Sequence, residues 1–252
     1  MSRNISNLKR KNLKNRILII LFLFSAQAFA KTADTNLFFE EALPFDGACN
    51  ALKQDDNYKI TEAMRTELTQ RIPEFEQIWK KKGPELLKTM SELLKHPYGR
   101  SEETMALTLC QWFSPMSQPL MLRMREYLKS TVVDNPKGPT EIKPDLYFVA
   151  QVFHELIHRY LDKYYADIDS PQNSALVKTH ASEPSGVLSH LHHLSIQKAV
   201  YLKLNREEDL KKIIELDSQI RGGVYKRAWE IVNADGYQKY IDELSKYKGR
   251  KK

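Results

Sequence analysis

The sequence predicts an α+β fold that is mostly helical, with a small antiparallel sheet packed on one central helix. Apolar residues recur at three- and four-residue spacing through most of the chain after residue 60, which is the period of a helix with one buried face. Two short stretches, 104–110 and 120–125, alternate instead with a period of two, which is typical of strands. Gly and Pro residues separate many of these segments.

The first thirty residues predict a signal peptide. Basic residues up to Arg16 precede a short apolar run, Ile17 to Ser25, and the small residues of Ala28-Phe29-Ala30 form a cleavage site. The apolar run is shorter than the about 20 residues of a membrane span. We expect cleavage after Ala30, a periplasmic or secreted location without a stable membrane span, and a single domain over residues 31–252. An uncleaved anchor is the alternative.

The net charge of +7 comes almost entirely from this leader, which carries six basic residues and no acidic one. The remainder holds 33 basic against 32 acidic residues, so nothing in it argues for binding nucleic acid. It also holds both cysteines, Cys49 and Cys110. In an oxidising compartment the pair can form a disulfide, and two buried free thiols are the alternative.

Helices are predicted first, beginning near Thr61. Pro73 should kink or split the first one, and Gly83-Pro84 should end it and open a second that stops at His96. The two alternating stretches, with a turn-rich segment at 114–119 between them, then predict a β-hairpin, although Met, Leu and Arg also suit a helix. Residues 134–144 predict a loop.

The central helix carries the chemistry. Residues 151–161 form an apolar helical run that contains His154, Glu155 and His158 in the order His-Glu-x-x-His. Residues four apart share one helix face, so the two imidazoles can bind one Zn²⁺. Zinc lowers the pKa of a bound water to about 7, and Glu155 can act as the general base that takes its proton. The alternative is two half-buried histidines that only make hydrogen bonds.

This stretch resembles the zincin metallopeptidases, whose motif places two His ligands and a catalytic Glu on a helix. One departure is Arg159, where the family usually has an uncharged residue. The resemblance implies a zincin-like fold in which a sheet edge binds an extended peptide. Asp162 lies four residues beyond His158 and could accept a hydrogen bond from that imidazole, but a solvated surface position is the preferred reading.

The third zinc ligand has to come from downstream, where Ser185 to Tyr201 predicts one helix and residues 210–244 predict three more. The candidates are His180, Glu183, His190, His192 and His193. On a helical wheel begun at Ser185, His193 falls on the solvent side, whereas His190 and His192 border the apolar face. We expect His190 to be the ligand. Glu183 is the alternative, because the resemblance to the gluzincin branch implies a Glu on a downstream helix.

The sequence thus predicts an exported zinc metallopeptidase that acts on a peptide or protein substrate, with Glu155 as base and His154, His158 and His190 as ligands. Two other classes stay open. One is a non-catalytic periplasmic metal-binding protein. The other is a degenerate zincin fold that serves as an interaction module, in which Glu155 would pair with a cation such as Arg159.

Overall fold

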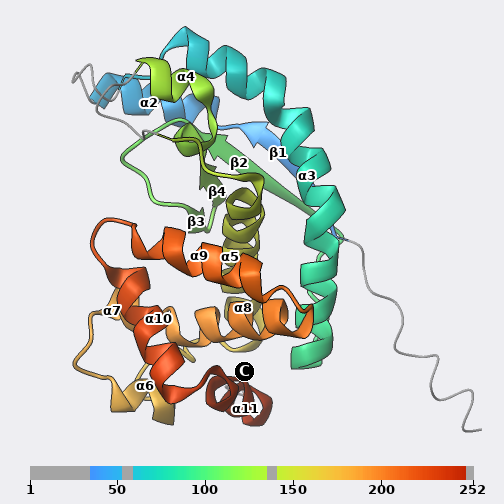
Figure 1. Cartoon of the computed structure of the whole chain (residues 1–252), viewed down its shortest axis with the longest axis vertical. Helices are drawn as coiled ribbons and strands as arrows, with labels where there is room; N and C mark the ends of the chain where they lie inside the picture. The colour runs from blue at the N-terminus through green and yellow to red at the C-terminus, as the bar shows by residue number, and fades with distance from the viewer. Residues whose placement is uncertain (1–34, 53–58, 135–140, 248–252) are drawn as a thin grey trace, which may run out of the picture. The chain divides into compact units, whose positions relative to one another are not determined.

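The computed structural model describes residues 35–52, 59–134 and 141–247, and the predicted signal peptide, most of the predicted loop and the last basic residues lie outside these ranges. Helices dominate and a small sheet accompanies them, so the α+β class is confirmed (Figure 1). The elements are β1 (Asn36–Glu41), α2 (Leu43–Leu52), α3 (Glu62–Leu94), β2 (Glu102–Thr108), β3 (Met116–Ser117), β4 (Leu120–Arg123), η2 (Arg125–Tyr127), α4 (Lys129–Asp134), α5 (Asp145–Tyr164), α6 (Ala175–Thr179), α7 (Ser185–Leu188), α8 (Leu191–Lys203), α9 (Glu207–Ser218), α10 (Val224–Asp235) and α11 (Tyr237–Lys246).

The sheet is mixed, which corrects the prediction of an antiparallel hairpin. Its order is β1-β2-β4-β3, and β2 pairs in parallel with both β1 and β4. Only β3 and β4 are antiparallel. The reason lies in the predicted turn: it contains β3, whose Ser117 pairs with Leu120, so the chain reverses there and β4 returns in the direction of β2. The sequence did not predict β1, which alternates exposed residues with the buried Leu37 and Phe39.

Cys49 and Cys110 form a disulfide, which settles the alternative that the sequence left open. The bond joins α2 to the segment that follows β2. Asp46 of α2 reinforces this junction, because its carboxylate accepts hydrogen bonds from the Thr108 hydroxyl and from the Leu109 amide, the latter at 3.0 Å.

The predicted break in the first helix is wrong, because α3 runs unbroken from Glu62 to Leu94 with Pro73 and Pro84 inside it. Each proline costs the helix one backbone hydrogen bond. Burial of apolar side chains on both sides of each proline offsets that loss. These buried residues are Met64, Leu68, Phe75, Trp79, Leu86, Leu87 and Met90.

The two ends of α3 lie close to the positions predicted from the sequence. Thr61 caps the helix, since its hydroxyl accepts the Met64 amide at 3.3 Å. At the other end Lys95 adopts a left-handed conformation with φ of 61°, just before the predicted stop at His96.

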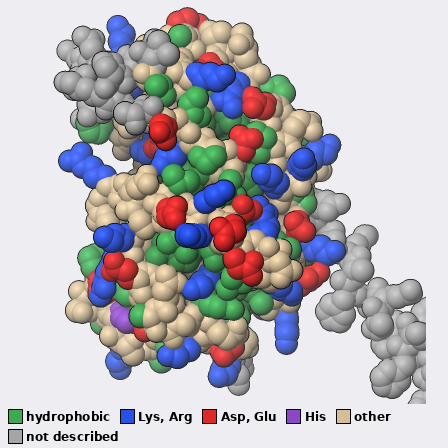
Figure 2. Space-filling model, viewed as in Figure 1, with side chains coloured by type: hydrophobic (Ala, Val, Ile, Leu, Met, Phe, Trp, Pro, Cys, Tyr) green, Lys and Arg blue, Asp and Glu red, His purple; other side chains and the backbone are tan. Residues whose placement is uncertain are grey.

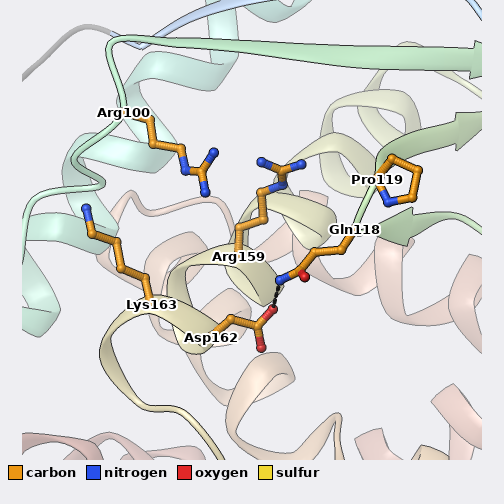
Figure 3. A pocket seen from close by; sticks show the side chains of 6 residues that line it. All are labelled: Arg100, Gln118, Pro119, Arg159, Asp162 and Lys163. Atoms are coloured by element: carbon orange, nitrogen blue, oxygen red, sulfur yellow. Dashed lines mark hydrogen bonds between the residues drawn. The ribbon is translucent and has the colours of Figure 1, made fainter. Parts of the chain in front are cut away.

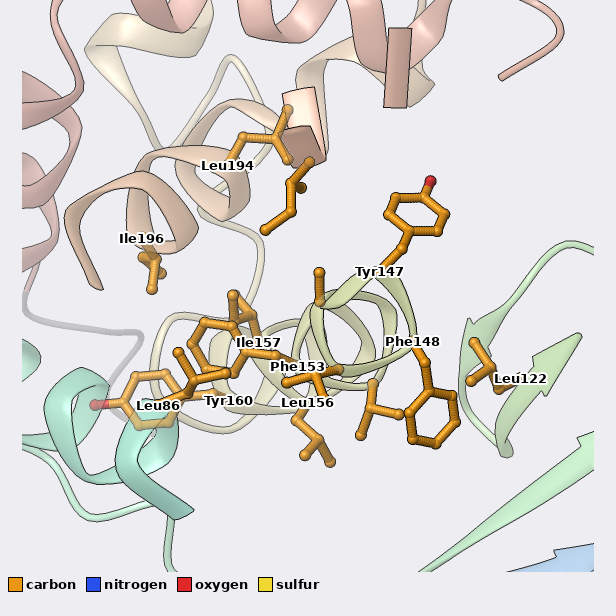
Figure 4. Close-up of a cluster of buried hydrophobic side chains, with 14 of the residues drawn as sticks. Leu86, Leu122, Tyr147, Phe148, Phe153, Leu156, Ile157, Tyr160, Leu194 and Ile196 are labelled. Atoms are coloured by element: carbon orange, nitrogen blue, oxygen red, sulfur yellow. The ribbon is translucent and has the colours of Figure 1, made fainter. Parts of the chain in front are cut away.

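Helix α5 confirms the predicted central helix, with Asp145 in its first turn. It is buried along most of its length and packs against α3, α8 and β4. Figure 4 shows its side chains pointing toward Leu122 of β4, Leu86 of α3, and Leu194 and Ile196 of α8. The motif is therefore held on a helix that its neighbours fix from several sides.

The predicted helix from Ser185 to Tyr201 is divided into α7 and α8. His190 lies between them, and its ring Nδ1 is 2.6 Å from the Gly186 carbonyl oxygen. Helix α8 also buries side chains all round, because α3, α5, α9, α10 and α11 pack against it. The prediction that His193 faces solvent is consequently wrong: its exposed fraction is 0%.

Helices α9, α10 and α11 complete the C-terminal part close to the predicted positions. Among the described residues, no helix is long and apolar enough to cross a membrane. Figure 2 shows one face of the molecule, on which Lys and Arg side chains are interspersed with Asp and Glu. This mixture agrees with the nearly balanced charge of residues 31–252.

Candidate metal centre

His154 and His158 lie one turn apart on α5, with their ring centroids 5.0 Å from one another. His154 is 2% exposed, and His158 is partly buried at the wall of a cleft. The two imidazoles of the motif therefore face the same place, as their spacing predicts.

His193 of α8 joins this pair. Its ring centroid is 3.8 Å from that of His154 and 4.2 Å from that of His158. One ligand nitrogen from each of the three rings lies within 4.8 Å of the other two, so the cluster could hold a metal ion. We refer to His154, His158 and His193 as the histidine cluster.

The hydrogen bonds of His193 suit a metal ligand. Its Nε2 is 2.8 Å from the His154 carbonyl oxygen, to which it can donate, and this leaves Nδ1 as the acceptor nitrogen. That Nδ1 is buried and has no hydrogen-bond partner among the described residues. A ligand histidine ordinarily donates its second N–H to a carbonyl or carboxylate in this way. The donor set therefore fits a cation such as zinc.

The electrostatics of the cluster favour neutral imidazoles. Burial, followed by repulsion from neighbouring histidines, lowers the pKa of His154 and of His193 well below the ordinary value. Burial and the charge of His190 lower the pKa of His158 to about 3. Metal ions bind the neutral form of imidazole, so the cluster would not have to lose protons to bind one at neutral pH.

His190, the ligand expected from the sequence, lies beside the cluster. Its ring centroid is 5.3 Å from that of His154 and 5.2 Å from that of His158. Its Nδ1 is engaged by Gly186, and it is not among the three residues whose ligand atoms converge. Burial lowers its pKa as well. The imidazole of His190 therefore lies beside the cluster as a neighbouring polar group.

The remaining candidates are engaged elsewhere. Glu183, the alternative ligand, forms an ion pair at 2.7 Å with Arg227 of α10. His180 contacts Asp235 at 2.7 Å, and His192 contacts Glu243 at 2.8 Å. The structure therefore does not bring these three side chains into the histidine cluster.

Glu155 follows His154 on α5, is 2% exposed and lines the same cleft. Burial raises the pKa of its carboxyl group to about 8. In the described part of the chain it has no ion-pair partner, and Arg159 instead binds Glu103 at 2.8 Å. The pairing of Glu155 with Arg159 that would have favoured a degenerate site is thus not present.

The cleft has a volume of about 660 Å³ and opens over the motif. Residues 114–118, which include the edge strand β3, form one wall, and Tyr225 of α10 lies on another. The Tyr225 hydroxyl is 3.5 Å from His154 Nε2, and burial raises its pKa, so it remains a neutral donor. Asp162 accepts a hydrogen bond of 2.7 Å from Gln118 at the rim, and among the described contacts it makes none with His158.

Sequence reasoning missed Tyr225 and ranked His193 last. The only signal for His193 was its position three residues after His190 in a helix that lacks a consistently polar side. Comparisons of the chain with protein-family models, with curated proteins and with solved structures found no match.

Proposed function

We propose that this chain is an exported zinc-dependent metallopeptidase that hydrolyses peptide bonds. The observation that carries the proposal is the convergence of His154, His158 and His193 next to Glu155, in a cleft bordered by an edge strand. Three imidazoles leave one position of a tetrahedral zinc site for water or substrate. When bound, the ion would act as a Lewis acid and lower the pKa of a water molecule to about 7.

Glu155 would move the protons. Its carboxyl group follows His154 on α5 and lines the cleft, so it is placed to act first as general base and then as general acid. As base, Glu155 takes a proton from the attacking water while the oxygen forms its bond to the carbonyl carbon. As acid, it then gives that proton to the amine nitrogen while the C–N bond breaks. The hydroxyl of Tyr225 is a neutral donor at the same place and can hydrogen-bond the substrate carbonyl.

The edge strand supports a peptide as substrate. β3 pairs only with β4 in the described sheet, and its residues line the cleft. An extended peptide can add to such an edge through main-chain hydrogen bonds, which do not depend on its side chains.

Metal content and activity of Glu155→Gln test the proposal. The purified protein should hold one zinc ion per chain, hydrolyse casein, lose this activity to a chelator and regain it with zinc. Glu155→Gln should keep the zinc, because the ligands are untouched, and lose activity by at least about 10²-fold. Glu215→Gln, which removes an exposed carboxylate from α9, is the matched control and should behave like the parent. Undiminished hydrolysis by Glu155→Gln would exclude the mechanism.

His190 favours a second candidate function, a non-catalytic metal-binding protein. Its ring lies within 5.6 Å of each ring of the cluster, so a modest movement could add a fourth imidazole and fill the open position. Stoichiometric zinc in a parent protein that hydrolyses neither casein nor shorter peptides would support this function over the peptidase.

Export is part of the proposal, because the sequence before Lys31 predicts a leader with a cleavage site after Ala30. The intact mass of the protein isolated from its producing cells should correspond to a chain that begins at Lys31. A mass that includes Met1 would indicate an uncleaved leader and would contradict this part of the proposal.

A further inference from the structure

A second pocket of about 580 Å³ adjoins the cleft. It is lined by Arg100, Gln118, Pro119, Arg159, Asp162 and Lys163, and we refer to it as the basic pocket. Gln118 and Asp162 line both the basic pocket and the cleft, so the two hollows meet at these side chains. A substrate that occupies the cleft can therefore extend into the basic pocket.

Three cations dominate the basic pocket. Figure 3 shows the guanidinium groups of Arg100 and Arg159 directed toward one another, with the amino group of Lys163 beneath Arg100. Two of these cations share one carboxylate: Glu103 pairs with Arg100 at 3.1 Å and with Arg159 at 2.8 Å. Lys163 makes no ion pair among the described residues. Its amino group donates to the Gly99 carbonyl oxygen at 3.4 Å and lies 4.9 Å from the centroid of the Tyr164 ring.

The positive charge therefore exceeds the negative charge at this place. Arg100, Arg159 and Lys163 stand against two carboxylates, and one of these, Asp162, is engaged by the Gln118 amide on the side of the cleft. Arg159 is also fixed, since its Nε donates to the Ser117 carbonyl oxygen of β3 at 2.7 Å. Guanidinium groups present several donors in a plane and bind carboxylates in preference to neutral groups.

We propose that the basic pocket is a specificity subsite that binds a carboxylate of the peptide substrate, displaced along the chain from the bond in the cleft. This inference rests on the proposed peptidase function and names its substrate class: peptides with an acidic group a few residues from the cleaved bond. The carboxylate can belong to an Asp or Glu side chain or to the C-terminus of the peptide. Arg100 and Lys163 supply cationic donors to this carboxylate, and Arg159 anchors the pocket to the edge strand.

Binding to the inactive Glu155→Gln protein tests the inference separately from catalysis. The probes are fluorescent hexapeptides of Ala and Leu that carry either Glu or Gln at each position in turn, each with a free or an amidated C-terminus. Their affinities are measured by fluorescence anisotropy for Glu155→Gln alone and with Arg100→Gln and Lys163→Gln added. The matched control adds Lys80→Gln and Lys88→Gln, which remove two exposed charges from α3 outside both pockets.

The peptides with a carboxylate at the favoured position should bind about tenfold more tightly than their neutral counterparts, and added salt should reduce this ratio. The pocket variant should abolish the ratio, and the control should keep it. A preference that follows Glu identifies a side-chain carboxylate, whereas one lost only on amidation identifies the C-terminus. Acidic peptides that bind no better than neutral ones, or a preference that survives the pocket variant, would overturn the inference. A preference in a protein that hydrolyses nothing would instead refute the proposed function alone.

Discussion

At the scale of single residues, the candidate site depends on which histidine of the α8 region reaches the motif helix. His193 is buried against both motif histidines and holds its Nε2 on the His154 carbonyl, so its free Nδ1 is fixed by the backbone of α5. His190 is held by the carbonyl of Gly186 in the short helix α7. A ligand fixed by the helix that carries the other two ligands needs no rearrangement to bind the same ion.

Zinc affinities of His193→Ala and His190→Ala therefore should differ. Loss of a ligand should weaken zinc binding by well over about 100-fold, whereas loss of a neighbouring group typically costs about 10- to 100-fold. Competition with a chromophoric chelator measures both, and His96→Ala, which alters an exposed histidine stacked on Tyr164, is the control. Parent-like affinity of His193→Ala together with a large loss in His190→Ala would restore His190 as the ligand.

At the scale of elements, helix α3 shows how packing overrides a local signal. The Gly83-Pro84 pair is a strong predictor of a helix end, yet α3 continues through it. Because Gly83 has no Cβ, the side chain of Trp79 can pack directly against the helix at this position. A Cβ built on Gly83 would be 2.3 Å from the indole Cε2. Position 83 therefore requires glycine, because the Trp79 indole lies too close to the helix backbone to leave room for a Cβ.

Replacement of Gly83 by Ala should consequently destabilise the protein by roughly 1–3 kcal/mol, because the buried indole must move. Gly47→Ala is the matched control: this glycine also lies in a helix, α2, and a Cβ there meets nothing within 4 Å. It should stabilise the protein by up to about 1 kcal/mol, the helix propensity difference. Chemical denaturation measures both, and equal effects of the two substitutions would show that the contact with Trp79 does not constrain Gly83.

At the scale of the whole molecule, the buried Asp217 connects three helices around the site. It belongs to α9 and accepts hydrogen bonds of 2.9 Å from Tyr147 of α5 and from Trp229 of α10. α10 also carries Tyr225, which contacts the histidine cluster. Burial raises the pKa of Asp217 to about 6, although these two hydrogen bonds oppose the rise.

This raised pKa predicts a pH dependence of stability. Between pH 3.8, the ordinary pKa of an Asp, and about pH 6, the pKa in the folded state, Asp217 keeps its proton when the protein is folded and loses it when the protein unfolds. Its contribution to stability is therefore present below about pH 4 and is lost as the pH rises through 6, by up to about 3 kcal/mol. Asp217→Asn cannot ionise, so the parent should lose stability relative to this variant between pH 4 and 7.

Urea unfolding of both proteins at several pH values measures this difference. Glu215→Gln removes an exposed carboxylate from the same helix and should differ from the parent by less than about 0.5 kcal/mol over this range. A difference between the parent and Asp217→Asn that does not change with pH would mean that burial of Asp217 does not penalise its charge.

By itself, the sequence determined the features that depend on local spacing. The four-residue interval places His154 and His158 on one face, the apolar period locates α5, and Thr61 marks the start of α3. These signals survive because residues three and four apart become neighbours whenever a helix forms, whatever packs around it.

Only the tertiary structure decided what depends on contacts between distant segments. The parallel pairing of β2 with β4 follows from the reversal at β3, and the place of His193 follows from a helix that is covered on all sides. A helical wheel assigns faces by hydrophobicity and assumes one solvent side, so it fails for α8, where five helices exclude solvent. The third member of the histidine cluster is therefore determined by how α8 packs on α5, which no local pattern in the sequence predicts.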